Sequence, residues 1–315
     1  MASPNSTTID YDQVNAVSKR YFVPKLYDNI FLGHPLMRRA KQKGWYKKIP
    51  GGTQIVIPLE YAILAASGSY SGAQTLDTSD NNVFTAATYD WKQYYASITI
   101  SRIDELKNGG TAQVIDFVKS KMKNSEKTLR RRLGSSTGLY SDGSVASELV
   151  GLVAHIDDDQ TVGGINQSTN SWWAAQQDAS TSVLSLSAMQ TRYNACSEDE
   201  EAPSVITTTK AIYNTYWGLL QPQQRFTSDD EAKAGFQALM FNGVPVISDT
   251  NCPSGDMYFL NENHLHWLVH EDEDFKFSEF SKPENQNVKV GQIFWAGAFG
   301  SSNNRYHGAF KAITG

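Results

Sequence analysis

The stretch from Thr111 to Leu133 constrains the fold most, because it has the pattern of one long amphipathic helix. Its apolar side chains recur at spacings of four, four, seven and four residues, which follows one face of a helix with about 3.6 residues per turn. They are Val114, Val118, Met122, Leu129 and Leu133. Thr111 is a suitable N-cap, and Gly134 stands where a left-handed stop is expected. We predict a spine helix over 111–133, roughly 33 Å long, that packs its stripe on a sheet.

The opposite face of this predicted helix is basic, with Glu126 as its one acidic residue. The cations are Lys119, Lys121, Lys123, Lys127, Arg130, Arg131 and Arg132. A solvated helix face is one interpretation, and a surface turned toward a polyanion is the other. The net charge is −5, but 19 Lys and Arg stand against 11 Asp and Glu up to Leu133, and 9 against 22 after it. The first part of the chain can therefore face nucleic acid while the rest faces solvent.

The composition is that of a globular protein, since 40% of the 315 residues are apolar and 19% are charged. This length suffices for one large or two ordinary domains. Cys196 and Cys252 lie far apart and match no metal spacing, so we expect reduced thiols of a protein made in the cytosol. The first twelve residues have neither a basic start nor an apolar core, so we expect no signal peptide.

Two segments before the helix have no evident surface of their own chain to pack against. Residues 1–45 are interrupted by Pro24 and Pro35 and end in a basic cluster, which is typical of an arm that lies on another surface. The β-rich segments 53–62 and 90–103 flank a polar, Gly-rich stretch and predict a long hairpin. Because an isolated hairpin is barely stable in water, we expect it to lie on a neighbouring subunit.

The chain after the helix alternates between predicted helices and strands. We expect helices over 186–197 and from Thr208 or Thr209 to Leu220, and a hairpin turn at Asn242-Gly243. The expected strands cover 204–208, 257–261, 264–270, 275–280 and 287–300. This order predicts an α+β fold in which one domain is interrupted by another.

No coherent catalytic set is evident. His264, His266 and Glu271 have the spacing of the first metal motif of cupins, but Tyr258 stands where that motif has Gly, and no second motif follows. We expect histidines on the solvent side of a strand rather than a metal site. The acidic runs 157–159 and 271–274 are interpreted as solvated loops. We therefore predict no catalytic residue, no metal and no cofactor.

The chain resembles the major capsid proteins of tailed bacteriophages nearly from end to end. The stretches that carry the resemblance are YFVPKLYDNIFLGHPL, GGTQIVIPLEYA, YDWKQYYASITISRIDELKNGG, TKAIYNTYWGLLQPQQRF, FQALMFNGVPVISD and IFWAGAFGSSNNRYHG. Encapsulin nanocompartments and the herpesvirus capsid floor share that fold, without a sequence likeness to this chain. The resemblance implies an α+β capsid fold whose parts follow the order found above. These are an N-terminal arm (1–45), an extended E-loop hairpin (46–100), a peripheral domain (101–200) with the spine helix, an axial domain (201–285) and a return strand of the peripheral domain (286–315).

The resemblance also implies a function. Such subunits form hexamers and pentamers of an icosahedral head that encloses double-stranded DNA. A virion protein of this kind is assembled in the bacterial cytoplasm, with a portal and a separate scaffolding protein as partners, and without a membrane. The alternatives are an encapsulin-like container for an enzyme and a metal-dependent, cupin-like enzyme.

Two residue sets follow as hypotheses. The spine residues that would contact DNA without reading its sequence are Lys119, Lys121, Lys123, Lys127, Arg130 and Arg131. The residues expected at the subunit interface are Trp91, Lys92, Tyr94, Tyr95, Arg38 and Arg39.

Overall fold

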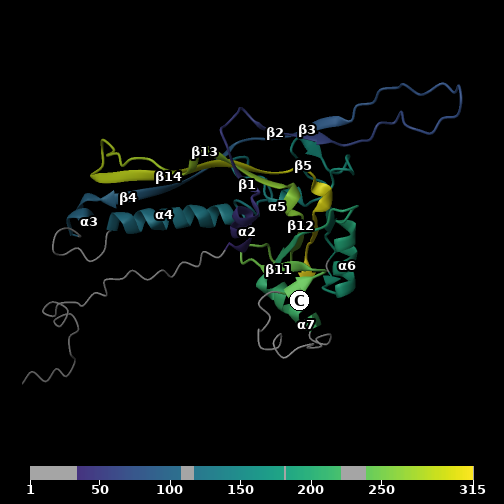
Figure 1. Ribbon diagram of the computed structural model, residues 1–315. Coiled ribbons are helices and arrows are strands. Elements are labelled where there is room, and N and C mark those ends of the chain that lie inside the picture. The colour runs from purple at the N-terminus through teal and green to yellow at the C-terminus, as the bar shows by residue number, and fades with distance from the viewer. Residues whose placement is uncertain (1–33, 108–116, 181, 221–238, 315) are drawn as a thin grey trace, which may run out of the picture.

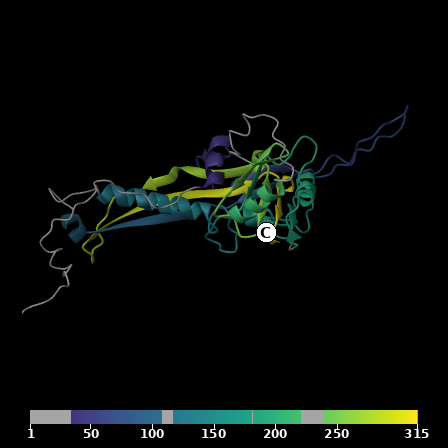
Figure 2. The same ribbon diagram turned by 90° about the horizontal axis from the view of Figure 1, so that it is seen from below.

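A computed structural model describes residues 34–107, 117–180, 182–220 and 239–314. Figure 1 shows a long sheet with a helix beside it, a compact region of short strands and helices at one end, and a two-stranded ribbon that projects from their junction. Figure 2 shows that the long sheet and its helix extend to one side of the compact region and the ribbon to the other. The mixture of helices and strands confirms the predicted α+β class.

The long sheet has four strands in the order β1-β13-β14-β4. They are β1 (Tyr46–Ile49), β13 (Leu265–Phe277), β14 (Val288–Ser301) and β4 (Lys92–Ser101). Strand β14 is antiparallel to both of its neighbours, whereas β1 joins the edge in parallel with β13. Buried and exposed positions alternate along β4, so one face of this strand points into the core. The predicted last strand, 287–300, is confirmed as β14.

Helix α4 (Phe117–Gly134) is the predicted spine and runs along strand β4 (Figure 1). Leu129 and Leu133 of the predicted stripe are buried, and Met122 packs against the same core from a half-buried position. The stripe therefore faces the sheet, as the periodicity predicted. The expected first turns, 111–116, lie outside the described residues.

Gly134 has a different role from the one its position indicated. It is the last residue of the helix and does not have a positive φ, so the prediction of a left-handed stop is wrong. A Cβ at this position would overlap the imidazole of His34. Glycine is therefore required here by the close approach of the segment that begins helix α2 (Pro35–Lys43).

The projecting ribbon has a different second strand from the predicted one. Strand β2 (Ile55–Glu60) lies in the predicted segment 53–62, but its partner is β3 (Phe84–Tyr89) rather than 90–103. The segment 90–103 forms β4, whose apolar face is covered by helix α4 and whose edge pairs with β14. Because β4 is paired with β14 and covered by helix α4 in the long sheet, it is not available as a strand of the ribbon.

The compact region is built on a six-stranded sheet with the order β10-β11-β9-β12-β15-β7. Its strands are β7 (Gln176–Asp178), β9 (Val205–Thr208), β10 (Leu239–Phe241), β11 (Val244–Ser248), β12 (Met257–Leu260) and β15 (Gly308–Phe310). The central strands β9 and β12 are buried at every residue. Asn242 and Gly243 have φ values of 49° and 77° and turn β10 into β11, which confirms the predicted hairpin.

The remaining elements are short and surround these two sheets. Helices α6 (Leu186–Ala195) and α7 (Lys210–Leu220) confirm the two helices expected after the spine, and both lie against the compact sheet (Figure 1). The others are α3 (Arg102–Lys107), α5 (Leu152–His155), β5 (Thr161–Val162), β6 (Ile165–Asn166), β8 (Ser182–Val183), β16 (Ile313–Thr314), η3 (Glu262–His264) and η4 (Asn304–Tyr306).

The two strands expected over 264–270 and 275–280 form the single strand β13. Its pairing register with β14 shifts in the region of the acidic run 271–274, and Phe275 has a φ of 56°. The acidic run therefore lies in an irregular part of a strand, and its prediction as a loop is wrong. A local irregularity lets four consecutive acidic residues occupy a strand at the surface.

Sheet membership crosses the predicted domain boundaries. Strand β13, within the predicted axial range 201–285, belongs to the long sheet, as does β4, most of which falls in the E-loop range 46–100. Strand β15, within the predicted return range 286–315, belongs to the compact sheet. The division into five segments stays a prediction.

Candidate assembly and nucleic-acid surfaces

The ribbon of β2 and β3 and the loop between them carry apolar side chains that have no cover within the described chain. The exposed ones are Val56, Ile63, Leu64, Tyr70, Leu76 and Phe84. Ile63 is 87% exposed, and Phe84 is 65% exposed. The loop extends far from both sheets (Figure 1). A series of exposed apolar side chains of this kind is typical of a surface that another protein covers.

The base of the ribbon is fixed, in contrast to its tip. Tyr89 and Trp173 share a buried cluster at this end of the ribbon. The Thr88 amide donates to the Gly163 carbonyl at 2.9 Å, and a Cβ at Gly163 would overlap Ala87. The ribbon is therefore attached rigidly at its root, so that its tip is presented in a defined direction.

The predicted interface pair Tyr94 and Tyr95 is divided between the two faces of β4. Tyr95 is 65% exposed, whereas Tyr94 is 5% exposed. The Tyr94 hydroxyl donates to the Thr137 carbonyl (2.5 Å) and accepts from the Leu149 amide (2.8 Å). Since neighbouring strand residues point to opposite faces, only Tyr95 is left for a partner. Tyr94 is part of the subunit's own core, and the place of this pair at a subunit interface stays a prediction.

Trp91 and Lys92 of the same predicted set are half-buried and have contacts within the chain. The Trp91 indole donates to the Gly52 carbonyl at 2.8 Å, and the Lys92 ammonium donates to the Ala146 carbonyl at 2.8 Å. These contacts fix both side chains near the root of the ribbon. Their place at a subunit interface stays a prediction.

The predicted arginine pair on helix α2 is also divided. Arg38 is exposed, whereas Arg39 binds both carboxylate oxygens of Glu262 at 2.7 and 2.8 Å and the Ser204 carbonyl at 3.3 Å. A bidentate pair of this kind fixes direction as well as distance. Arg39 therefore connects helix α2 to the end of the compact sheet. Because Arg39 and Glu262 lie far apart in sequence, no local sequence pattern indicated this contact. Only Arg38 is fully available to a partner.

The basic residues of the spine lie at the surface of helix α4 to different extents. The exposed ones are Lys119, Lys123, Arg130 and Arg131, and the half-buried ones are Lys121 and Lys127. Lys121 donates to the Thr99 carbonyl of β4 at 2.8 Å, and Arg130 pairs with Glu126 at 2.5 Å. The exposed members leave a positive surface along the helix. Their contact with nucleic acid stays a prediction.

The cupin-like residues do not come together as a metal site. His264 lies in the short helix η3, where its Nδ1 is 3.0 Å from the Ser302 hydroxyl and its ring stacks on Tyr306 at 4.7 Å. Within the described part of the chain, the one group of acidic, His and Cys side chains close enough to share an ion is 157–159. It does not include His264, His266 or Glu271. The Lys311 ammonium lies 2.6 Å from Asp157 and balances part of the charge of that acidic run.

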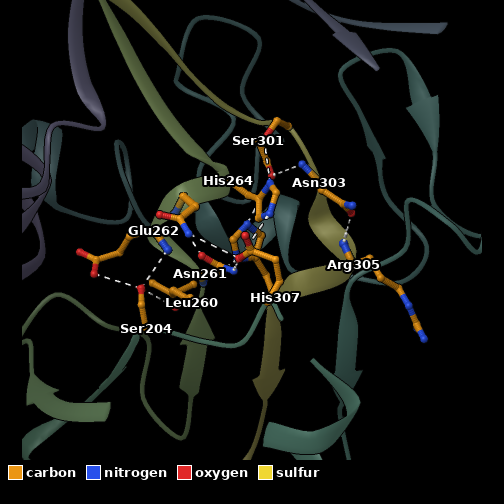
Figure 3. Close-up of polar contacts among 12 residues, drawn as sticks. Ser204, Leu260, Asn261, Glu262, His264, Ser301, Asn303, Arg305 and His307 are labelled. Carbon is orange, nitrogen blue, oxygen red and sulfur yellow. Dashed lines mark hydrogen bonds and ion pairs between the residues drawn. The ribbon is translucent and has the colours of Figure 1, made fainter. Parts of the chain in front are cut away.

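Two buried histidines that the sequence did not single out lie at the junction of the two sheets. His307 accepts a hydrogen bond from the Asn261 amide through Nδ1 (3.2 Å), and its Nε2 lies 3.3 Å from the Ser301 hydroxyl (Figure 3). The ring proton therefore sits on Nε2. Burial holds the pKa of His307 well below its usual range, and it lowers the pKa of His155 to about 4. Both rings are neutral parts of the core.

Neither cysteine has the surroundings of a nucleophile. Cys196 and Cys252 are buried, and burial raises the pKa of the Cys196 thiol to about 12. The pKa of the Cys252 thiol is raised by the same cause. A thiol held protonated in this way cannot act as a thiolate.

Solved structures with the same arrangement come from virus-like particles. An 11% identical capsid protein of a native GTA particle matches with a TM-score of 0.73, over 99% of this chain and 100% of that chain. A 15% identical chain of the cyanophage A-1(L) capsid matches with a TM-score of 0.72, over 96% of this chain and 99% of that chain. No family model and no curated protein sequence matches the chain.

The chain has the fold of tailed-phage capsid proteins. The capsid fold explains why the ribbon and the long sheet extend so far from the compact region, since the likeness covers these parts as well. A 9% identical encapsulin from Synechococcus elongatus shares the fold with a TM-score of 0.57, over 98% of this chain and 96% of that chain. None of the described helices is long and apolar enough to cross a membrane.

Proposed function

We propose that this chain is a major capsid protein, the subunit of an icosahedral phage head. In this proposal its copies form hexamers and pentamers, and the closed shell encloses double-stranded DNA. Support comes from the capsid fold, which extends over at least 96% of the chain in the two matches to phage and GTA capsids. The cupin-like alternative is less favoured, because His264, His266 and Glu271 do not form a group close enough to share an ion among the described residues.

The projecting ribbon is the observation that carries the proposal. Its root is packed into the subunit, whereas its tip presents Ile63, Leu64 and Leu76 to solvent. In a ring of identical subunits, the ribbon of each copy can lie on the next copy, and such head-to-tail contacts close when the rotation is right. Burying these side chains on a neighbour contributes roughly 1.5–3 kcal/mol for each fully buried large apolar side chain.

The nucleic-acid face of the subunit is assigned to helix α4. We infer that Lys123, Arg131 and the other basic residues of the spine helix line the inner surface of the shell. There they neutralise phosphates, and contacts of this kind carry no sequence information. The acidic second part of the chain then faces outward.

The partners follow from this role. We propose a portal and a separate scaffolding protein as assembly partners, no enzymatic activity, and assembly in the cytoplasm of a bacterial host. The buried, protonated state of Cys196 is consistent with a non-catalytic protein made in a reducing compartment.

Particle formation by the purified chain tests the proposal directly. We expect electron microscopy to show closed shells or their capsomers for the wild type, and loss of shells for Leu76→Asp, because a charge at this position opposes burial on a neighbour. Thr75→Asp adds the same charge at the adjacent exposed residue and is the matched control. A wild-type chain that stays monomeric under all assembly conditions, or a Leu76→Asp chain that assembles as the wild type does, contradicts the proposal.

The content of the particles separates the phage head from the encapsulin-like container, which is the less favoured alternative because the encapsulin matches with the lower TM-score of 0.57. Nuclease-protected double-stranded DNA inside particles from infected or induced cells supports the phage head. A co-purified enzyme inside particles without DNA supports the container instead.

The inner-face assignment has its own test. We expect the double variant Lys123→Gln/Arg131→Gln to bind duplex DNA more weakly. The slope of log K against log salt should become shallower by about one for each phosphate that the variant no longer neutralises. A matched control, Lys43→Gln/Lys282→Gln, replaces two exposed lysine residues outside the spine helix. An unchanged salt slope in the spine variant contradicts the assignment to helix α4.

A further inference from the structure

A cavity of about 240 Å³ lies where helix α2, strands β1 and β13 and the last turns of helix α4 meet. Figure 1 shows these elements converging between the long sheet and the compact region. The lining residues used below are Arg38, Lys41, Tyr46, Arg130, Trp267 and Phe275. None of the described residues that line the cavity is acidic.

The cavity combines cationic edges with aromatic walls. The Lys41 ammonium lies 4.7 Å from the centre of the Tyr46 ring, and the Arg130 guanidinium lies 5.4 Å from the centre of the Phe275 ring. Arg38 adds a third, exposed cation. Each of the first two cations is held over a ring, which positions its charge at the cavity.

Two acidic groups beside the cavity, Asp274 and Glu126, are already engaged in pairs with other residues. Asp274 accepts from the Tyr46 hydroxyl (2.7 Å) and pairs with Lys48 (2.8 Å). Glu126 pairs with Arg130 from one helical turn earlier on the same face, and it is not part of the cavity lining. The positive charge of Arg38 and Lys41 is therefore not cancelled by these carboxylates.

Two ring N–H groups on the cavity lining lack acceptors within the described chain. Trp267 is fully buried, and its Nε1 has no hydrogen-bond partner. His34 receives a hydrogen bond from the Asn251 amide nitrogen at Nδ1 (2.9 Å), so its ring proton sits on Nε2, which also has no partner. A buried donor without an acceptor is costly, and it is rare in native proteins.

We propose that this cavity is the docking site for an acidic peptide segment of a partner protein, with a carboxylate at Arg38 and Lys41 and an adjacent apolar or aromatic side chain against the cavity walls. The carboxylate supplies the negative charge and the acceptor oxygens that the lining lacks. The apolar side chain packs against the half-buried Phe275. This proposal concerns the single subunit and goes beyond its role in the shell.

The size and the chemistry of the cavity favour a peptide over other ligands. Pockets that enclose a whole small molecule have volumes of roughly 300–1,000 Å³, so a cavity of about 240 Å³ suits one or two anchoring side chains. Duplex DNA presents phosphates on a convex surface, without an apolar group to cover the aromatic walls. An acidic peptide offers both kinds of group within two residues.

The test uses the purified full-length protein and the capped dipeptide acetyl-Phe-Glu-amide. Its neutral counterpart is acetyl-Phe-Gln-amide, and a 20-base-pair duplex is the nucleic-acid arm. The readout is the indole N–H resonance of Trp267 in a spectrum of nitrogen-labelled protein, identified by its loss in Trp267→Phe. We expect the acidic dipeptide to shift this resonance in a saturable way, and to bind at least fivefold more tightly than the neutral dipeptide.

Three variants locate the site. We expect Arg38→Gln/Lys41→Gln to weaken binding of the acidic dipeptide at least tenfold, and Met37→Trp to block it by filling the cavity while the charges remain. Lys43→Gln lies on the same helix outside the cavity lining and should bind as the wild type does. Equal melting temperatures for the variants exclude misfolding as the cause.

Several results would overturn the proposal. They are no shift of the Trp267 resonance with the acidic dipeptide, equal binding of the two dipeptides, wild-type binding by Arg38→Gln/Lys41→Gln, or a shift of this resonance by the duplex alone. The last result would assign the cavity to nucleic acid. Shell formation is measured separately, so failure here leaves the proposed function standing.

Discussion

The buried imidazole of His155 makes the stability of the subunit sensitive to acid. Its ring stacks on Tyr89 (centroids 5.8 Å apart) and meets the edge of Phe299 (5.1 Å), while its Nδ1 is 2.9 Å from the Gly151 carbonyl. Its Nε2 has no hydrogen-bond partner among the described residues, so a second proton on the ring would not be solvated. Burial therefore lowers the pKa of His155 to about 4, from an ordinary value of 6.5.

The sign of the effect follows from proton linkage. Above pH 6.5 the imidazole is neutral in both the folded and the unfolded chain, and the stability it contributes is fully present. Below pH 6.5 the unfolded chain binds a proton on this imidazole, whereas the folded chain binds it only near pH 4. The free energy of unfolding therefore decreases as the pH is lowered. For these two pKa values, the loss at pH 5 relative to pH 7.5 is about 2 kcal/mol. His307 is also held below its usual pKa by burial and adds a loss of the same sign.

The His155 contribution can be isolated by substitution. We expect urea unfolding of the unassembled wild type to lose about 2 kcal/mol more between pH 7.5 and pH 5 than His155→Asn does. Asparagine keeps a donor for the Gly151 carbonyl, and its packing loss applies equally at both pH values. Phe299→Leu loosens the same packing without removing the titrating ring, so it should keep the wild-type pH dependence. Equal pH dependence of His155→Asn and the wild type would refute the reasoning.

Three further substitutions test the packing of the subunit, each measured by urea unfolding of the unassembled chain. Gly134→Ala should cost about 1–3 kcal/mol, because the added methyl group overlaps His34, and a cost near zero would mean that the ring moves aside freely. Leu129→Ala should cost about 2–5 kcal/mol by leaving a cavity under the spine, whereas Thr128→Ala on the exposed side should change the stability by less than about 0.5 kcal/mol. Glu262→Gln should cost about 1–3 kcal/mol, since it leaves the half-buried Arg39 without its anion, and a loss that disappears in Arg39→Gln/Glu262→Gln would show that the uncompensated charge is the cause.

The sequence predicted best the elements whose one face is buried over a long distance. Burial on one face imposes a periodicity on the apolar residues of an element. The stripe that includes Leu129 and Leu133 therefore predicted helix α4, and the alternation around Ile98 and Ile100 predicted a strand where β4 lies. Turn chemistry was equally direct at Asn242-Gly243, where two positive φ values need residues of this type.

Strand partners were harder to predict, because alternation gives the two faces of a strand and says nothing about its edges. The segment 90–103 was assigned to the ribbon on proximity in sequence, whereas its edge pairs with β14 from the far end of the chain. The true partner of β2 is β3, a strand rich in Thr and Ala whose apolar signal is weak. Alternation also gave no signal that the Tyr94 hydroxyl is bonded inside the subunit.

Residues that act across long sequence separations left no local signal. His307 joins the end of β14 to β12, and Arg39 joins helix α2 to Glu262, each through a geometry that only the fold creates. The surface cations on helix α4 were predictable because a solvated charge depends mainly on its own position in the helical period. Their contacts within the chain, such as that of Lys121 with the Thr99 carbonyl, follow from the fold and not from the periodicity.

The Arg39–Glu262 pair also connects the fold to assembly. In a ring of identical subunits, each copy repeats any deviation in the angle between its compact region and its long sheet. A shell subunit must therefore hold these two parts at a fixed angle. Helix α2 touches both parts: Leu36 is buried in the core under the long sheet, and Arg39 binds Glu262 at the end of the compact sheet. The buried His307 contacts the adjacent residue of the same segment, since its Nδ1 accepts from the Asn261 amide. Its Nε2 lies 3.3 Å from the Ser301 hydroxyl at the end of β14. Directional polar contacts at a junction restrict rotation more than an apolar contact of equal strength, because a hydrogen bond weakens steeply as its angle changes. These contacts therefore help to hold the two parts at one angle. On the proposed function, loss of either contact should broaden the distribution of particle sizes before it unfolds the subunit.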